Sequence, residues 1–426
     1  MTTEVAVMNR TAISLAADSA VTIGGDKVYN TVNKLFTLSK TEPVGVMVYG
    51  SASIMNVPWE TVIKTYRKEL GAKSFPTLKA YSDDFIEFLS RDGGIFSEKA
   101  RERFIDQTIL SLCDLMREEV VNDERLQGDS DESIYKRAAQ IASEIVKREY
   151  EAISAGCEIS EISDRVEKML EVHGDRFYRL AASSLEKIFP LLEVGDKELL
   201  RRALAMYFHS DYLLGDFSGI VIAGFGEQDL FPKVITMHMQ GFLGSTNKVV
   251  VESAKSNLVE DEEFSASIIP FAQSDMIHTF LAGIDPFLDR VYRNEAAGTI
   301  MNVVDAAADK VREDEREQFR TDLAAAAEEA FGSMLKAIET KQRETYLSQV
   351  ISMLDSLPKD ELAEMAETLV NLIAFKKKVT RGTESVGGPI DVAIITKGDG
   401  FVWMKRKHYF DPALNHHFFS NYNKNI

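Results

Sequence analysis

The chain opens with two short apolar runs, Glu4-Val5-Ala6-Val7-Met8 and Ala12-Ile13-Ser14-Leu15-Ala16, which are parted by Asn9-Arg10-Thr11. Both runs have the period-two character that is typical of β-strands. Because the connection is so short, we expect the two strands to pair as an antiparallel hairpin. The residues that flank this hairpin, Thr2 before it and Asp18 after it, would then lie close together.

Further strands are expected in the middle and at the end of the chain. Residues 44–49 form a short, continuous and β-branched run that ends at Gly50-Ser51-Ala52, as a buried strand would. Residues 219–225 and 234–237 are similar, and residues 390–395 and 401–404, joined through Gly398-Asp399-Gly400, resemble a hairpin.

Between these strands the hydrophobic period becomes helical. Ile105, Ile109, Leu112 and Met116 are spaced by four, three and four residues, which places them on one helix face. Strands at both ends and in the middle, separated by helical blocks, indicate one α/β or α+β core with helical insertions rather than tandem domains.

The composition excludes several function classes. The 426 residues contain 49 Lys+Arg and 67 Asp+Glu, a formal net charge of -18, which argues against broad nucleic-acid binding. The seven His are scattered and the two Cys lie far apart, so neither a metal site nor a disulfide framework is predicted. No run approaches a membrane span and no basic-then-apolar leader opens the chain, so we expect a soluble cytoplasmic protein with no membrane partner.

Thr2 is the candidate nucleophile. Its small side chain permits removal of Met1, which would leave a threonine with a hydroxyl and a free α-amine on one residue. A threonine hydroxyl needs an adjacent base, and an N-terminal amine can serve as one. The reference pKa of such an amine is about 7.7–8.0, and a nearby ammonium group would lower it.

Asp18 and Lys34 are the candidate partners of Thr2. Asp18 lies sixteen residues after Thr2, and Lys34 lies sixteen residues after Asp18. An Asp–Lys pair beside the nucleophile would keep the ammonium group charged and oriented. The backbone N–H of Gly50, at the end of the third strand, is the candidate oxyanion donor.

These residues resemble the opening of a proteasome β-subunit, and equally that of the bacterial ATP-dependent heat-shock peptidase, which also begins Met-Thr-Thr. The spacing of Thr2, Asp18 and Lys34 matches without a gap, and Tyr49-Gly50-Ser51-Ala52 is similar to the family's oxyanion turn. Thr22 falls where the family has a substrate-lining threonine, and Thr22 and Ser51 are the candidate substrate-binding residues. The segments 221–225 and 386–392 resemble later strands of the family.

The resemblance implies an N-terminal-nucleophile (Ntn) hydrolase, an α+β fold with a four-layer αββα sandwich and two long helical insertions. The core would comprise residues 1–92, 216–285 and 380–426, and the insertions residues 93–215 and 286–379. The implied activity is a threonine-type peptidase or amidohydrolase without metal or organic cofactor. The implied partners are a peptide or protein substrate, further copies in a homo-oligomer and an ATP-dependent unfoldase.

The chain departs from the family pattern before Gly387-Gly388. Where proteasomes have Asp and Ser, this chain has Thr383 and Val386, with Glu384 and Ser385 each displaced by one position. Glu384 and Ser385 are therefore candidate accessory residues. A further family serine falls at Met239. Two alternatives stay open: a catalytically inactive proteasome-like structural or assembly module, and a small-molecule amidase.

Overall fold

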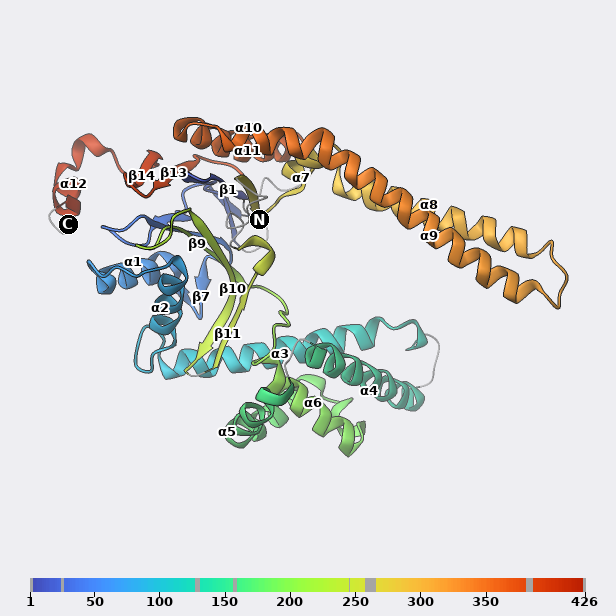
Figure 1. Ribbon diagram of the computed structural model, residues 1–426. Helices are drawn as coiled ribbons and strands as arrows, with labels where there is room; N and C mark the ends of the chain where they lie inside the picture. The colour runs from blue at the N-terminus through green and yellow to red at the C-terminus, as the bar shows by residue number, and fades with distance from the viewer. Residues whose placement is uncertain are drawn as a thin grey trace.

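The computed structural model describes residues 3–23, 27–126, 131–155, 159–244, 246–256, 266–380 and 386–423. It is a mixed α+β structure with two five-stranded antiparallel sheets (Figure 1). Thr2, Glu384 and Ser385 lie outside the described residues.

Sheet I contains the first strands of the chain and has the order β12-β1-β2-β13-β14. The predicted hairpins are confirmed, because β1 pairs with β2 and β13 pairs with β14, both antiparallel. Strand β2 also pairs with β13, which joins the two ends of the chain. The strands are β1 (Thr3–Asn9), β2 (Ala12–Ala17), β12 (Ala266–Ala272), β13 (Asp391–Thr396) and β14 (Gly400–Lys405).

Sheet II has the order β11-β10-β9-β6-β5. Its strands are β5 (Leu35–Thr37), β6 (Val44–Gly50), β9 (Ser218–Gly224), β10 (Lys233–Leu243) and β11 (Thr246–Val251). The described residues also form two small antiparallel ribbons of two strands each. One pairs β3 (Val21–Ile23) with β4 (Lys27–Tyr29), and the other pairs β7 (Ser53–Ile54) with β8 (Val57–Pro58).

The two sheets face each other across an apolar layer. Along β1 and β2, one set of alternate residues points into this layer, as the period of two requires. Ala6 and Met8 of β1 meet Met47 of β6 and Val221 of β9 there. All four side chains are fully buried, so this layer is the centre of the core.

The outer face of each sheet is covered by helices. The other alternate residues of β1, Val5 and Val7, pack with Leu369 and Val370 of α11 on the outer face of sheet I. On sheet II, Ile220 and Ile222 are among the residues that pack under two further helices. The covering helices are α7 (Asp275–Ala282), α10 (Ser348–Asp355) and α11 (Lys359–Val379) on sheet I, and α1 (Trp59–Leu70) and α2 (Leu78–Ser90) on sheet II.

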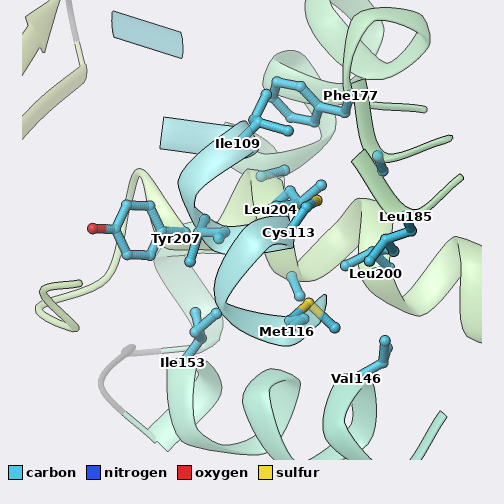
Figure 2. Packing of buried hydrophobic residues seen from close by; sticks show 14 of the residues in the cluster. Ile109, Cys113, Met116, Val146, Ile153, Phe177, Leu185, Leu200, Leu204 and Tyr207 are labelled. Atoms are coloured by element: carbon cyan, nitrogen blue, oxygen red, sulfur yellow. The ribbon is translucent and has the colours of Figure 1, made fainter. Parts of the chain in front are cut away.

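A separate helical bundle lies between α2 and β9 in sequence. Its helices are α3 (Glu98–Asn122), α4 (Asp131–Ala155), α5 (Ile159–Leu185) and α6 (Val194–Tyr207). Figure 2 shows its own hydrophobic cluster, in which residues of all four helices meet. The predicted helix face is confirmed, since Ile105, Ile109, Leu112 and Met116 are all buried in this cluster.

Buried polar contacts fix the bundle to sheet II. Lys248 of β11 is 2% exposed, and its ammonium group contacts the backbone carbonyls of Tyr207 and Ser210. The Tyr207 hydroxyl donates to Gln240 of β10 at 2.7 Å, and the Gln240 amide donates to the Leu214 carbonyl at 2.7 Å. The bundle therefore has its own core but a defined position on the sheet.

Helices α8 (Pro286–Ala308) and α9 (Arg316–Gln342) form a long hairpin that projects away from the sheets (Figure 1). We call this hairpin the arm. The chain returns from it through a π-helical turn, Arg343–Leu347, into α10 and α11, and it closes with α12 (His416–Asn423). Helix α11 lies inside the range that the sequence assigned to an insertion, but it packs on sheet I. In the described part of the chain, no helix is long and apolar enough to cross a membrane.

Gly219 of β9 provides a test of the packing at the end of sheet II. It lies opposite Tyr49 of β6, and a Cβ atom on residue 219 would stand 2.0 Å from the Tyr49 ring. Because that ring is packed among Phe217, His238 and Phe271, it has little room to move.

We expect Gly219→Ala to lower the free energy of unfolding by about 1–3 kcal/mol, the usual effect of overpacking. Gly298→Ala in α8 is the matched control, because its Cβ would meet nothing within 4 Å and helical Gly→Ala stabilises by about 0.5–1 kcal/mol. Urea unfolding of the two variants measures both effects. Equal stability of the two variants would contradict the described position of Tyr49.

Candidate active site

Asp18 and Lys34 form a buried ion pair at the edge of the apolar layer. The Lys34 ammonium nitrogen lies 2.5 Å from Asp18 Oδ1, and the side chains are 5% and 0% exposed. Asp18 follows β2 of sheet I, and Lys34 immediately precedes β5 of sheet II. The predicted proximity of these two residues is therefore present, and the pair connects the two sheets.

Asp18 is held by three backbone N–H groups as well as by Lys34. Thr3 N–H donates to Oδ1 at 3.1 Å, while Ala20 N–H and Gly387 N–H donate to Oδ2 at 3.3 Å and 3.0 Å. Hydrogen bonds to a carboxylate are among the stronger ones in proteins. Asp18 thus ties the start of the chain to Gly387, just after the segment where the accessory residues were expected.

The candidate nucleophile, Thr2, is outside the described residues, and so are Glu384 and Ser385. Thr3, the next residue, donates to Asp18 through its backbone and begins β1. The backbone of Thr22 lies in β3, where it pairs with Val28. The roles predicted for these residues accordingly remain predictions.

Gly50 ends β6 in a conformation that favours glycine. Its φ is +75°, and a Cβ atom would stand 2.4 Å from the Phe217 carbonyl oxygen. The next residue, Ser51, donates its backbone N–H to the same carbonyl at 3.0 Å, and its hydroxyl donates to the Ser53 carbonyl at 2.8 Å. This turn is tightly fixed, and Gly50 itself is exposed.

Lys34, Gly50 and Ser51 share one pocket of about 150 Å³, which Val21, Val48 and Trp59 also line. A larger pocket of about 500 Å³ begins at Ser51 and runs between the β7–β8 ribbon and helix α3. Gln107 and Thr108 of α3 line this second pocket. Three of the predicted site residues therefore meet at one cavity, and Ser51 lines both cavities.

Glu4 is a buried carboxyl group that the sequence analysis did not select. Its side chain is 0% exposed, and among the described residues neither carboxyl oxygen has a hydrogen-bond partner. Burial raises the pKa of Glu4 well above its usual value, the Asp18 charge raises it further, and the Lys34 charge opposes both. The available signal was its place in β1, where the period of two puts Glu4 on the same side as Ala6 and Met8.

A row of three polar side chains, Tyr49, His238 and Glu252, lies near the Glu4 carboxyl group. The Tyr49 hydroxyl is 2.8 Å from His238 Nε2, which is 3.2 Å from a Glu252 carboxyl oxygen. Burial raises the pKa of Tyr49, and the Glu252 and Glu4 charges raise it further. Burial also lowers the pKa of His238, although the Glu252 charge opposes this. Tyr49, which packs in the layer between the sheets, thus connects that layer to the partly exposed His238 of β10 and Glu252.

Two of the positions where the chain departs from the family pattern are packing positions. Val386 is 5% exposed and belongs to the cluster between sheet I and α11. Met239 is fully buried in the cluster between sheet II and its helices. Neither side chain offers a hydroxyl to the pocket. Over the described ranges, no three His, Cys, Asp or Glu side chains are grouped as metal ligands.

No protein-family model matches the chain, and no curated protein matches it. Among solved structures, the chain is similar to Anbu (ancestral beta-subunit) from Yersinia bercovieri, with 8% sequence identity and a TM-score of 0.28. That match covers 99% of this chain and 94% of the other. A TM-score of this size decides neither fold nor activity, so the assignments that follow rest on the residues and their geometry.

Glu4→Gln tests the buried carboxyl group through the pH dependence of stability. The pKa of Glu4 is higher in the folded state than in the unfolded state. The free energy of unfolding that Glu4 contributes is therefore fully present below the unfolded pKa, and it is lost as pH rises towards the folded pKa. The variant cannot ionise here. Its stability relative to wild type should therefore increase above about pH 4.5, by about 1.4 kcal/mol per pH unit.

Urea unfolding at several pH values between 4 and 8 measures this difference. Glu118→Gln, at an exposed position of α3, is the control for removing one surface carboxyl group. A stability difference between Glu4→Gln and wild type that stays constant across this range would contradict the buried, unpaired state of Glu4.

Proposed function

We propose that this protein is a threonine-type Ntn hydrolase that cleaves amide bonds of peptides, with Thr2 as the nucleophile after removal of Met1. The observation that carries the proposal is the buried Asp18–Lys34 pair next to the first described residue. Thr3, which follows Thr2 in the sequence, donates its backbone N–H to Asp18. A buried ion pair is a weak source of stability, and a functional role accounts for it better.

Each residue has a chemical role in this proposal. The Thr2 hydroxyl attacks the substrate carbonyl carbon, and its proton passes to the Thr2 amine, through one water molecule. The Lys34 ammonium lowers the pKa of that amine, which keeps it neutral enough to act as the base. Asp18 holds Lys34 charged and in place. These are the functions that a threonine nucleophile needs from its surroundings.

The remaining steps use the Gly50 turn. The backbone N–H of Gly50 would stabilise the oxyanion of the tetrahedral intermediate, an effect worth about 100- to 1,000-fold in rate. The protonated amine then gives its proton to the leaving nitrogen, and an ester remains on Thr2. Water hydrolyses the ester and restores the hydroxyl. Ser51 and Thr22 are proposed to bind the substrate on either side of this turn.

We also propose that the stacking of α10 and α11, the two sheets, and α1 and α2 is the four-layer αββα sandwich of this class. The hydrophobic clusters on both faces of each sheet support this reading. In this division the core includes α11, residues 93–215 are the first insertion, and the arm is the projecting part of the second. A homo-oligomer and an ATP-dependent unfoldase remain proposed partners.

A small-molecule amidase is the second candidate, and the size of the pocket favours it. The cavity at Lys34 and Gly50 has about 150 Å³, whereas pockets for drug-sized ligands usually have about 300–1,000 Å³. Such a cavity suits a small acyl group. The adjoining cavity of about 500 Å³ favours the longer, peptide substrate instead.

The intact mass of the protein, before and after treatment with a peptide epoxyketone, tests the nucleophile directly. This reagent forms its cyclic adduct with both a hydroxyl and a free α-amine on one residue. We expect a chain without Met1 that gains the mass of one probe. Thr2→Ala should gain none, because the hydroxyl is absent.

Thr3→Val is the matched control, since it removes the neighbouring hydroxyl and keeps the shape of the side chain. Labelling of Thr3→Val at the wild-type rate would place the reaction at Thr2. A chain that retains Met1 and stays unlabelled would overturn the enzyme proposal and favour the inactive structural module. Labelling accompanied by hydrolysis of small amides but not of peptides would favour the amidase.

A further inference from the structure

The helical bundle contains a cavity of about 400 Å³ between helices α3, α4 and α6. We call it the bundle cavity. Most of its wall consists of apolar side chains from these three helices. The wall includes Met116, Val146, Ile153, Leu200 and Leu204, which Figure 2 shows. All five side chains are buried, so they belong to the core of the bundle and also face an unfilled space.

An apolar space of this size is unusual inside a bundle of helices. Protein interiors are normally packed as densely as organic crystals, and apolar side chains that face a void lose the contacts that such packing provides. Apolar cavities therefore bind apolar molecules when these are present. Pockets that hold small organic ligands have volumes of about 300–1,000 Å³, a range that includes the bundle cavity. The wall thus predicts an occupant with an apolar body.

The charged residues that line the bundle cavity are all acidic. They are Glu118 and Glu119 of α3 and Glu149 of α4. Arg148 binds two of them, since its guanidinium group donates to Glu119 at 2.7 Å and to Glu149 at 2.7 Å. Glu149 also accepts a hydrogen bond from the Tyr212 hydroxyl at 3.2 Å. One guanidinium group beside three carboxylates leaves this side of the cavity negatively charged.

Glu118 has a carboxylate that is open to a ligand. In the described part of the chain, its side chain forms no hydrogen bond or ion pair, and it is exposed at the same side of the cavity as Glu119. An ammonium group at this place would form a charge-assisted hydrogen bond with Glu118. A carboxylate group of a ligand would instead meet a like charge. The charges therefore favour a cationic head group over an anionic one.

We propose that the bundle cavity binds a small hydrophobic cation, an amine with an alkyl or aromatic body. The apolar body occupies the space between α3, α4 and α6, where it replaces water against apolar side chains. The ammonium group lies at the acidic side of the cavity and contacts Glu118. The proposal concerns the helical bundle and does not depend on the catalytic role of Thr2.

The cavity of about 500 Å³ beside Ser51 is the alternative place for such a ligand, because Leu112 and Leu115 line both cavities. In the described part of the chain, Asp216 is its one charged lining residue. Its wall also carries the amide of Gln107, whose bound water an apolar body would displace without replacing the hydrogen bonds. The bundle cavity therefore suits a hydrophobic cation better, and the experiments must distinguish the two.

The first experiment measures the binding of three probes to the full-length protein by isothermal titration calorimetry at pH 7. The probes 4-phenylbutylamine, 4-phenylbutan-1-ol and 4-phenylbutyrate share one apolar body and differ in the charge of the head group. We expect a Kd below about 1 mM for the amine and binding of the carboxylate that is weaker by at least about 10-fold. A larger Kd for the amine, or equal affinity for the carboxylate, would overturn the proposal.

The second experiment locates the head group with two matched variants. Glu118→Gln removes the free carboxylate of the bundle cavity, and Asp216→Asn removes that of the other cavity. Both positions are exposed, so the fold should persist. We expect Glu118→Gln to weaken binding of the amine by about 2- to 5-fold and to leave binding of the alcohol unchanged. Weaker amine binding in Asp216→Asn but not in Glu118→Gln would place the amine in the other cavity and overturn the proposal.

A third variant locates the apolar body. Ala203 of α6 is 4% exposed and lines the bundle cavity but not the other one. Leucine at this position would occupy part of the apolar space, so Ala203→Leu should weaken binding of both the amine and the alcohol by more than about 10-fold. Circular dichroism checks its fold. A folded Ala203→Leu variant that binds the amine as tightly as wild type would contradict the proposed place of the apolar body.

Discussion

The contact between Asp18 and Lys34 is the constraint on which the rest of the site depends, because it fixes the two sheets relative to each other where the chain begins. Asp18 comes from sheet I and Lys34 from sheet II, and both are almost fully buried. Burying two charges costs desolvation free energy, and only good geometry with further hydrogen bonds offsets that cost. Here the Thr3, Ala20 and Gly387 N–H groups supply those bonds. The same bonds bring the first strand, the pocket at Gly50 and the late strand β13 to one place.

Much of this arrangement could be predicted from the sequence because it depends on local pattern. The period of two identified β1 and β2, and their short connection required a hairpin, which returned Asp18 to the start of the chain. The turn after Asp18 was then expected to bring Lys34 alongside, and the two side chains do form an ion pair. The helix face from Ile105 to Met116 was equally local, since the period alone places these residues on one side of the helix.

The features that the sequence did not reveal depend on which other strands and helices pack against each element. The pattern of β1 showed which side Glu4 takes, but not that a second sheet closes over that side and leaves the carboxyl group without a partner. Likewise, residues 286–379 form one helical block by pattern. Only the packing separates α11, whose Leu369 and Val370 lie on sheet I, from the arm, whose helices lie almost wholly in solvent. Val386 and Met239 could be aligned with polar family positions, yet both are core residues here.

The pairing of β2 with β13, and the hydrogen bond from Gly387 to Asp18, also affect the order in which the molecule is completed during synthesis. Residues 18 and 387 are separated by 369 positions, so β2 and Asp18 must wait until residues 387–396 have been made. Until β13 leaves the ribosome, β2 has an open edge and Asp18 lacks one of its donors. A growing chain therefore holds Asp18, and the Lys34 ammonium group that it contacts, with an incomplete set of hydrogen bonds until residue 387 has been made.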